Sequence, residues 1–160
     1  ATKLIPDKKI IPTYYIHYLQ ARAGIEMLEL KNAMANGIPY RKEVEILRKT
    51  VRLLIRLSAS VPSSAIEAWR LMGLLQWWTG HQRQALRSFA KSIKAGRQLG
   101  CNLELSRTYA ETGRFPLDPG TRYSSLLGTS GSEYLMNAKA MMEELDLQWD
   151  LAACERYLEA

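Results

Sequence analysis

The segment Gly128–Glu133 (GTSGSE) comes nearest, in this chain, to a phosphate-binding loop. Glycine-rich loops hold phosphates with free backbone N–H groups, and the nucleotide-hydrolysing versions add a lysine and follow a strand. This segment has no lysine, and no strand pattern precedes it. We therefore interpret it as a loop and a helix start, in which Ser130 or Ser132 caps the next helix.

The other reactive residue types are scattered. His17 and His81 are isolated from each other, which favours packing or exposure to solvent over catalysis. Cys101 and Cys154 lie far apart and outside any CxxC pair, so neither suggests zinc. An acidic run near the C-terminus comprises Glu143, Glu144, Asp146 and Asp150. It lacks the spacing of a calcium loop. The sequence therefore predicts no catalytic residue, no metal site and no cofactor.

Positive charge is concentrated in two segments. Between His81 and Leu103 the chain carries no acid, and its cations are Arg83, Arg87, Lys91, Lys94 and Arg97. The first four follow helical spacing and form one basic stripe. Residues 41–56 are also mainly basic. Such a stripe is most often a solvated helix face; the alternatives are contact with an acidic partner, with the acidic end of a neighbouring repeat, or with nucleic acid. No helix-turn-helix pattern or aromatic stacking platform accompanies it, which disfavours nucleic acid.

Helical periodicity accounts for almost the whole chain. It predicts helices over residues 14–36, 41–58, 64–79, 82–99, 103–112, 132–145 and 149–158. The first has two apolar stripes, which predicts neighbours on two sides. Gly37 is placed to take a left-handed conformation at its end. Ser64 and Glu67 have the spacing of a capping box.

Two internal matches suggest a repeated unit of about 33 residues. Gly80 and Gly113 each follow a helical segment, and residues 99–105 (LGCNLEL) align with residues 145–151 (LDLQWDL). In the second match Glu104 falls on Asp150. An irregular insertion at about 114–131 separates the two copies.

Residues 65–112 resemble the tetratricopeptide repeat, whose pattern is W-x2-L-G-x2-Y followed by A-x3-F. The matching residues are Trp69, Gly73, Ala85, Phe89, Leu105 and Tyr109. Met72 replaces the leucine, Gln76 the tyrosine, and Ser106 the second glycine. The last 60 residues bear a looser resemblance to the helical tails of large bacterial regulators, which combine an ATPase module with a cyclase or kinase domain.

The resemblance implies an all-α fold, a right-handed solenoid of about three antiparallel helix pairs with a C-terminal closing helix, over residues 1–160 as one domain. It also implies a concave groove lined by the first helix of each pair. The groove residues carried over from the family are Arg70, Leu74, Trp77, Trp78, Leu103, Arg107 and Ala110. We expect Trp69 to be buried, Trp77 to be half-exposed in the groove, and Gly73 to tolerate a side chain less well than Gly131.

A repeat surface of this kind implies a non-catalytic protein-interaction module. Its partner would be a protein or peptide, or other domains of a larger signalling protein. The alternative function is a basic module that binds nucleic acid or another anionic surface through the stripe from Arg83 to Arg97. The longest apolar runs are far shorter than the roughly 20 residues of a membrane span, and we expect a cytoplasmic protein.

Overall fold

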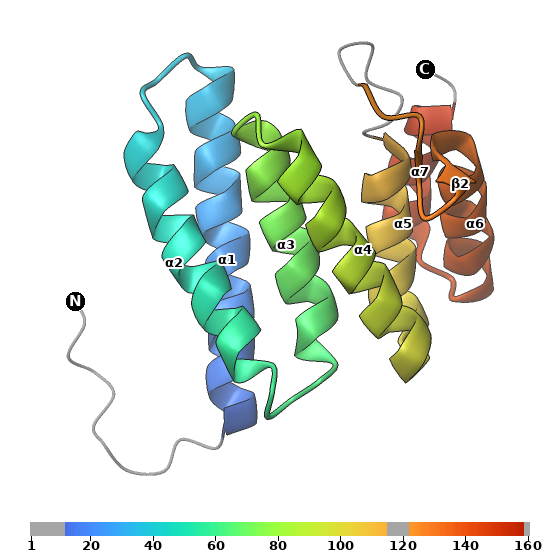
Figure 1. Cartoon of the computed structure of the whole chain (residues 1–160), viewed down its shortest axis with the longest axis horizontal. Helices are drawn as coiled ribbons and strands as arrows, with labels where there is room; N and C mark the ends of the chain where they lie inside the picture. The colour runs from blue at the N-terminus through green and yellow to red at the C-terminus, as the bar shows by residue number, and fades with distance from the viewer. Residues whose placement is uncertain (1–11, 115–121, 159–160) are drawn as a thin grey trace.

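The computed structural model of the chain describes residues 12–114 and 122–158. Its elements are α1 (Pro12–Ala35), α2 (Arg41–Leu57), α3 (Ser64–Trp78), α4 (Gln82–Leu99), α5 (Asn102–Arg114), β1 (Ser125–Leu126), β2 (Thr129–Ser130), α6 (Gly131–Glu144) and α7 (Gln148–Leu158). The helices stand side by side, with α1 and α2 at one side, α3 and α4 in the middle, and α5, α6 and α7 at the other side (Figure 1). The predicted all-helical fold class is confirmed, with one small hairpin added.

The helix boundaries follow local signals, with one exception. Gly37 has φ +65°, as its place after α1 predicts. Ser130 caps α6 in a full capping box with Glu133, which confirms the helix-start interpretation of that segment. The capping box predicted at Ser64 is wrong. Its hydroxyl donates to the Val61 carbonyl, and the Glu67 carboxylate accepts from the Gln20 side chain instead.

Part of the predicted insertion is ordered. Strands β1 and β2 pair antiparallel around a two-residue turn, Leu127-Gly128, in which both residues have positive φ. The Tyr134 hydroxyl donates to the Leu126 carbonyl at 2.9 Å and ties the hairpin to α6. The rest of the insertion, residues 115–121, lies outside the described residues, so its predicted mobility stays a prediction.

Helices α3 and α4 approach closely at Gly73. A Cβ added at this glycine would lie 2.9 Å from the Phe89 ring, closer than real contacts allow. Phe89 and Ala85 are fully buried on the facing side of α4. The small residue and the aromatic ring, which the repeat pattern picked out, are therefore one packing unit.

Helix α3 occupies the centre of the N-terminal part. It contacts α2 and α4, its neighbours along the chain, and also α1 and α5. One buried cluster contains residues of α1, α2, α3 and α4, and a second contains residues of α4, α5, α6 and α7. Between the clusters, the buried Ser92 hydroxyl of α4 donates to the Ile66 carbonyl of α3 and lies 2.9 Å from Thr108 Oγ1 of α5. Those contacts join three helices.

The sequence had suggested that Gly131 is a loop residue, and this prediction is wrong. Gly131 is the first residue of α6 and is buried. Its carbonyl oxygen would lie 2.7 Å from a Cβ built on Gly113 of α5. Because Gly131 is buried and lies at this close helix contact, a substitution there is not a neutral comparison for Gly73.

Gly24 provides the proper comparison, because it lies within α1 and a Cβ there meets nothing within 4 Å. We expect Gly73→Ala to lower the free energy of unfolding by about 1–3 kcal/mol, because the methyl group overpacks the contact with Phe89. Gly24→Ala should raise it by about 0.5–1 kcal/mol, because alanine loses less entropy in a helix. Urea denaturation of both variants measures the difference. Equal effects would contradict a packing role for Gly73.

Candidate functional site

A row of charged side chains crosses the odd-numbered helices. In α3, Arg70 lies 3.4 Å from Glu104 of α5 and 3.9 Å from Glu67 of its own helix. Glu67 in turn accepts a hydrogen bond of 2.6 Å from Gln20 of α1. Three helices are thus connected by polar side chains that are largely removed from solvent.

The row continues from α5 to α7 through Arg107. Its guanidinium lies 2.9 Å from Glu104 on the same helix and 2.9 Å from Asp150 of α7. The hydrogen bond to Asp150 raises the pKa of Arg107, against the opposing effect of burial. We call Glu67, Arg70, Glu104, Arg107 and Asp150 the ion-pair row. Its charges alternate in sign, and each has an opposite charge within 4 Å.

Glu67 is the member of this row whose ionised form is destabilised by burial. Burial raises the pKa of its carboxyl group, because a carboxylate loses hydration there. The charge of Arg70 acts in the opposite direction but does not cancel this effect. The ionised form of Glu67 is consequently less stable in the folded chain than in the unfolded chain.

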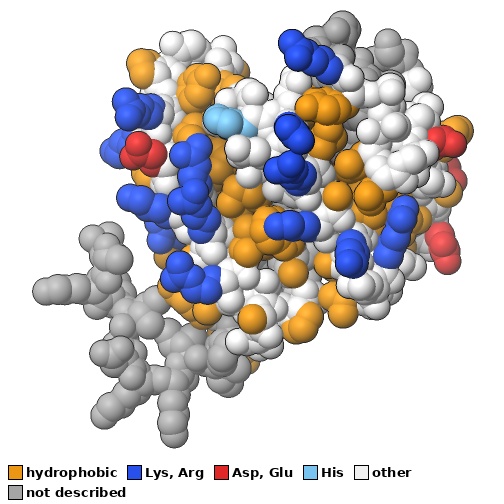
Figure 2. Space-filling view, in the orientation of Figure 1, with side chains coloured by type: hydrophobic (Ala, Val, Ile, Leu, Met, Phe, Trp, Pro, Cys, Tyr) orange, Lys and Arg blue, Asp and Glu red, His pale blue; other side chains and the backbone are white. Residues whose placement is uncertain are grey.

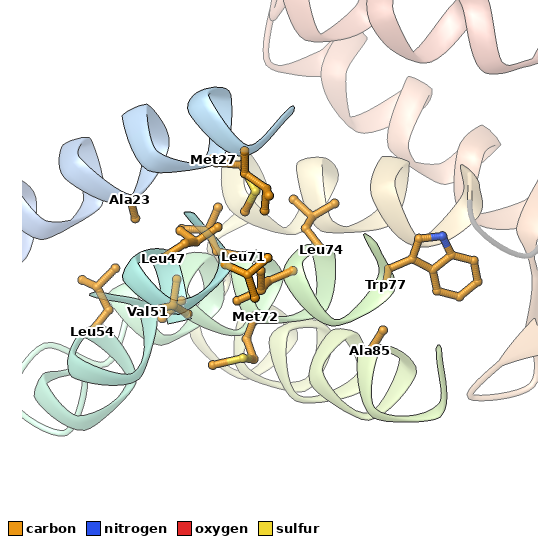
Figure 3. Packing of buried hydrophobic residues seen from close by; sticks show 14 of the residues in the cluster. Ala23, Met27, Leu47, Val51, Leu54, Leu71, Met72, Leu74, Trp77 and Ala85 are labelled. Atoms are coloured by element: carbon orange, nitrogen blue, oxygen red, sulfur yellow. The ribbon is translucent and has the colours of Figure 1, made fainter. Parts of the chain in front are cut away.

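The predicted groove residues separate into two groups. Arg70 and Arg107 lie in the ion-pair row. Leu74, Trp77 and Ala110 are buried, with exposed fractions of 5%, 9% and 8%. The expectation that these three side chains face an open groove is wrong. They already contact their own chain, and Leu74 and Trp77 belong to the N-terminal buried cluster (Figure 3).

The physical reason is the central position of α3. Besides α4, the helices α1, α2 and α5 also contact α3. A side chain that points away from one of these helices therefore meets another. Trp78, one residue further on, is partly buried with Lys31 Nζ 5.1 Å above its ring. Leu103, at the start of α5, is exposed, and its assignment to a groove stays a prediction.

Trp69 was expected to be buried, and it is more exposed than expected. It is partly buried rather than fully buried, and it packs against the rim of the N-terminal cluster. Lys91 Nζ of α4 lies 4.0 Å from the centre of its ring, at cation–π distance. One cation of the predicted basic stripe is thus held by an aromatic side chain of α3.

The basic stripe is present on the surface. Arg83, Arg87, Lys91 and Lys94 are all exposed on α4, and within residues 12–114 and 122–158 none forms an ion pair. Lys and Arg side chains gather over both α2 and α4 on the face seen in Figure 2. We call these two helices' solvent-facing cations the basic face.

Two hollows open on the basic face. One, of about 190 Å³, lies between α2 and α4 and is lined by Arg48, Arg52 and His81 together with uncharged residues. The other, of about 650 Å³, is lined by Arg83, Arg87 and Arg122 beside the start of α4. No Asp or Glu lines either hollow. Both are therefore suited to a negatively charged group.

The remaining reactive groups do not assemble. Among the described residues, no three His, Cys, Asp or Glu side chains are placed to hold a metal ion. His17 and His81 are exposed on different elements. Cys101 and Cys154 are both free thiols. The helices of the described segments include none with the length and apolar character required to cross a membrane.

Comparison of this chain with protein-family models, with curated proteins and with solved structures gave no match.

The carboxylates of the ion-pair row were not predicted as site residues. One signal for them was present: the internal match aligned Glu104 with Asp150, and Arg107 bridges these two residues. The partnership of Glu67 with Gln20 had no such signal, because the two residues are 47 positions apart in the chain.

Trp77→Ala should lower the free energy of unfolding by about 3–5 kcal/mol, because it leaves a cavity in the cluster. Trp149→Ala is the matched control. Trp149 is 93% exposed on α7, so we expect a change within about 0.5 kcal/mol. Thermal and urea melts followed by circular dichroism compare them. A Trp77→Ala variant as stable as the wild type would contradict the burial of Trp77 and support its predicted place in a groove.

The raised pKa of Glu67 predicts how the stability of the fold depends on pH. Because the folded-state pKa of Glu67 is raised, its stabilising contribution is complete below the ordinary pKa of 4.5 and is lost as pH rises through the folded-state pKa. We expect Glu67→Gln to be more stable than the wild type at neutral pH, with a difference that vanishes in acid. Glu133→Gln should be destabilised at neutral pH, because the Ser130 hydrogen bonds lower the pKa of Glu133. Two variants that respond alike would contradict this account.

Proposed function

We propose that this chain is a non-catalytic interaction module of the tetratricopeptide type, whose basic face binds an acidic segment of a protein partner. The segment could belong to a separate protein or to another domain of a larger signalling chain. The observation that carries the proposal is the contrast between the two sets of charges. Every charge of the ion-pair row has an opposite charge within 4 Å, whereas the stripe on α4 has no ion-pair partner in the described part of the chain.

Repeated local geometry supports the repeat interpretation. The turns after α4 and α6 have left-handed residues at aligned positions, Gly100 with φ +62° and Asp146 with φ +53°. Each turn also places a hydrogen bond from the next N–H to a carbonyl five residues earlier: Cys101 to Gly96, and Leu147 to Met142. Asp146 adopts this conformation without being glycine, which is uncommon for other residues but tolerated by aspartate.

The arrangement of the odd-numbered helices also supports it. Helix α3 contacts α1 and α5, and α5 contacts α7, in addition to the contacts between successive helices. A stack of helix pairs produces this pattern, because each pair packs on the next. The close contact of Gly73 with Phe89 is the equivalent pairing within one unit.

An acidic polypeptide fits the basic face better than nucleic acid does. Non-specific recognition of single strands requires aromatic rings on which bases can stack. The tryptophans beside the basic face are engaged by the chain's own lysines, Trp69 by Lys91 and Trp78 by Lys31. The stripe from Arg83 to Lys94 runs along about three turns of helix, roughly 16 Å, which suits a short acidic helix or strand.

The test compares the binding of two fluorescent probes, a glutamate-rich peptide and a single-stranded DNA oligomer of equal charge. We expect the peptide to bind more tightly at physiological salt. Arg87→Glu should weaken its binding roughly tenfold, because it places like charges together in the interface. Arg156→Glu is the matched control. It changes the net charge equally but lies on α7, at an exposed position away from the basic face.

Several results would overturn the proposal. Equal loss in the two charge-reversed variants would show that binding follows net charge alone. Tighter DNA binding, with an affinity that falls steeply as salt rises, would show that the basic face is a nucleic-acid site. Failure of both probes to bind would leave the basic face as a solvated surface.

A further inference from the structure

Helix α1 carries an apolar face that residues 12–114 and 122–158 leave uncovered. Tyr14, Tyr18, Ile25 and Leu28 are 69%, 53%, 61% and 58% exposed. Together with the exposed Ala21 they follow a spacing of four, three, four and three residues, so they form one straight line along the helix. We call these five residues the α1 stripe. The opposite side of α1 is the buried one, with Ile16, Leu19, Ala23, Met27 and Leu30 in the core.

The sequence had predicted neighbours on both sides of this helix, and among the described residues only one side has them. Contiguous exposed apolar patches on monomeric proteins often mark a contact site. Four large exposed apolar side chains in one line on a single helix form such a patch rather than scattered exposure. It is typical of a helix that packs against another one.

Helix α3 shows what the equivalent face does when a helix covers it. Gly37 and Gly80 both have positive φ directly after α1 and α3, which fixes how the two helices align. The alignment pairs Ala21, Ile25 and Leu28 with Ser64, Ala68 and Leu71. All three counterparts on α3 are buried, at 4%, 0% and 5% exposure. Ala68 and Leu71 belong to one cluster with residues of α1 and α2, and Figure 3 shows Leu71 within it. The α1 stripe therefore has the position of a helix-docking face.

We propose that the α1 stripe binds the same stripe of a second copy of this chain, with the two α1 helices antiparallel. A two-fold axis requires a surface that is complementary to itself. The stripe meets this requirement when the axis passes beside Ile25, because Ala21 then lies opposite Leu28 of the partner subunit. A small residue faces a large one at both symmetric positions, as close helix packing requires.

Charge at the edge of the stripe favours the same arrangement. Arg22 and Glu29 lie on one flank of the stripe, two helical turns apart, and both are exposed. An antiparallel copy reverses their order, so Arg22 comes beside Glu29 of the partner subunit, and the reciprocal pair forms on the other side of the axis. Arg22 already holds Glu26 at 2.7 Å, so its guanidinium would bridge two carboxylates.

This surface is separate from the basic face. The cations of the basic face are carried by α2 and α4, whereas the stripe lies on α1. Self-association through α1 would join two modules and leave both basic faces available. Two linked binding sites raise the apparent affinity for a partner that carries repeated acidic segments, without a new contact.

The first test is the molar mass of the complete chain in solution, measured by light scattering and by sedimentation over a range of concentrations. We expect a dimer. Ile25→Glu should raise the dimer dissociation constant at least about tenfold, because it places two like charges on the axis. It should leave the circular dichroism and the monomer fold unchanged, because Ile25 is exposed. Trp149→Glu is the matched control, as it changes an exposed apolar residue on α7, and it should stay dimeric.

A second measurement gives the geometry directly. Ile25→Cys, in a chain with Cys101→Ser, should form a disulfide between copies under mild oxidation, because the two thiols meet at the axis. Leu158→Cys in the same background should not. A wild-type chain that is monomeric at high concentration would overturn the proposal. So would a dimer that Trp149→Glu dissociates and Ile25→Cys fails to cross-link, since that result would show head-to-tail contact through α7.

Discussion

The close contact between Gly73 and the Phe89 ring fixes the relation of α3 to α4, and much of the structure follows from it. A glycine at this position brings two helix backbones together, and a fully buried ring fills the space on the facing side. With α4 held there, the other sides of α3 are available to α1, α2 and α5. Trp77 and Leu74 are buried for the same reason, because they project from a helix that is covered on every side.

The second constraint is electrostatic. The odd-numbered helices carry both signs of charge, and contact between them brings Arg70 and Arg107 to the carboxylates of the neighbouring helices. Partly buried charges need such partners, because they have lost part of their hydration. On α4 the cations of the stripe are exposed, so hydration remains available to them. Arginines therefore form a paired row between the odd-numbered helices, whereas lysines and arginines form a basic surface on α2 and α4.

These constraints also divide the surface of the molecule. The face that the repeat resemblance marked as a groove is occupied by the chain's own side chains, so a partner would find few free apolar groups there. The basic face offers unpaired charge around two hollows. The α1 stripe offers apolar area without charge at its centre. A surface with unpaired cations and a surface with uncovered apolar side chains attract different kinds of partner, by different forces.

The sequence by itself determined the helices, the glycine after α1, a serine cap for α6 at Ser130 or Ser132, and the small residue at Gly73, because each depends on neighbours within one or two helical turns or on a matched pattern. It also determined the basic stripe, since helical spacing alone puts four cations on one side of α4. Only the tertiary structure decided which stripe of α1 is covered, that Trp77 is buried and Trp69 is not, and that Glu67 meets Gln20. Those outcomes depend on how many helices surround each helix and from which direction. Residues distant in the chain set that number, and periodicity within one helix carries no information about it.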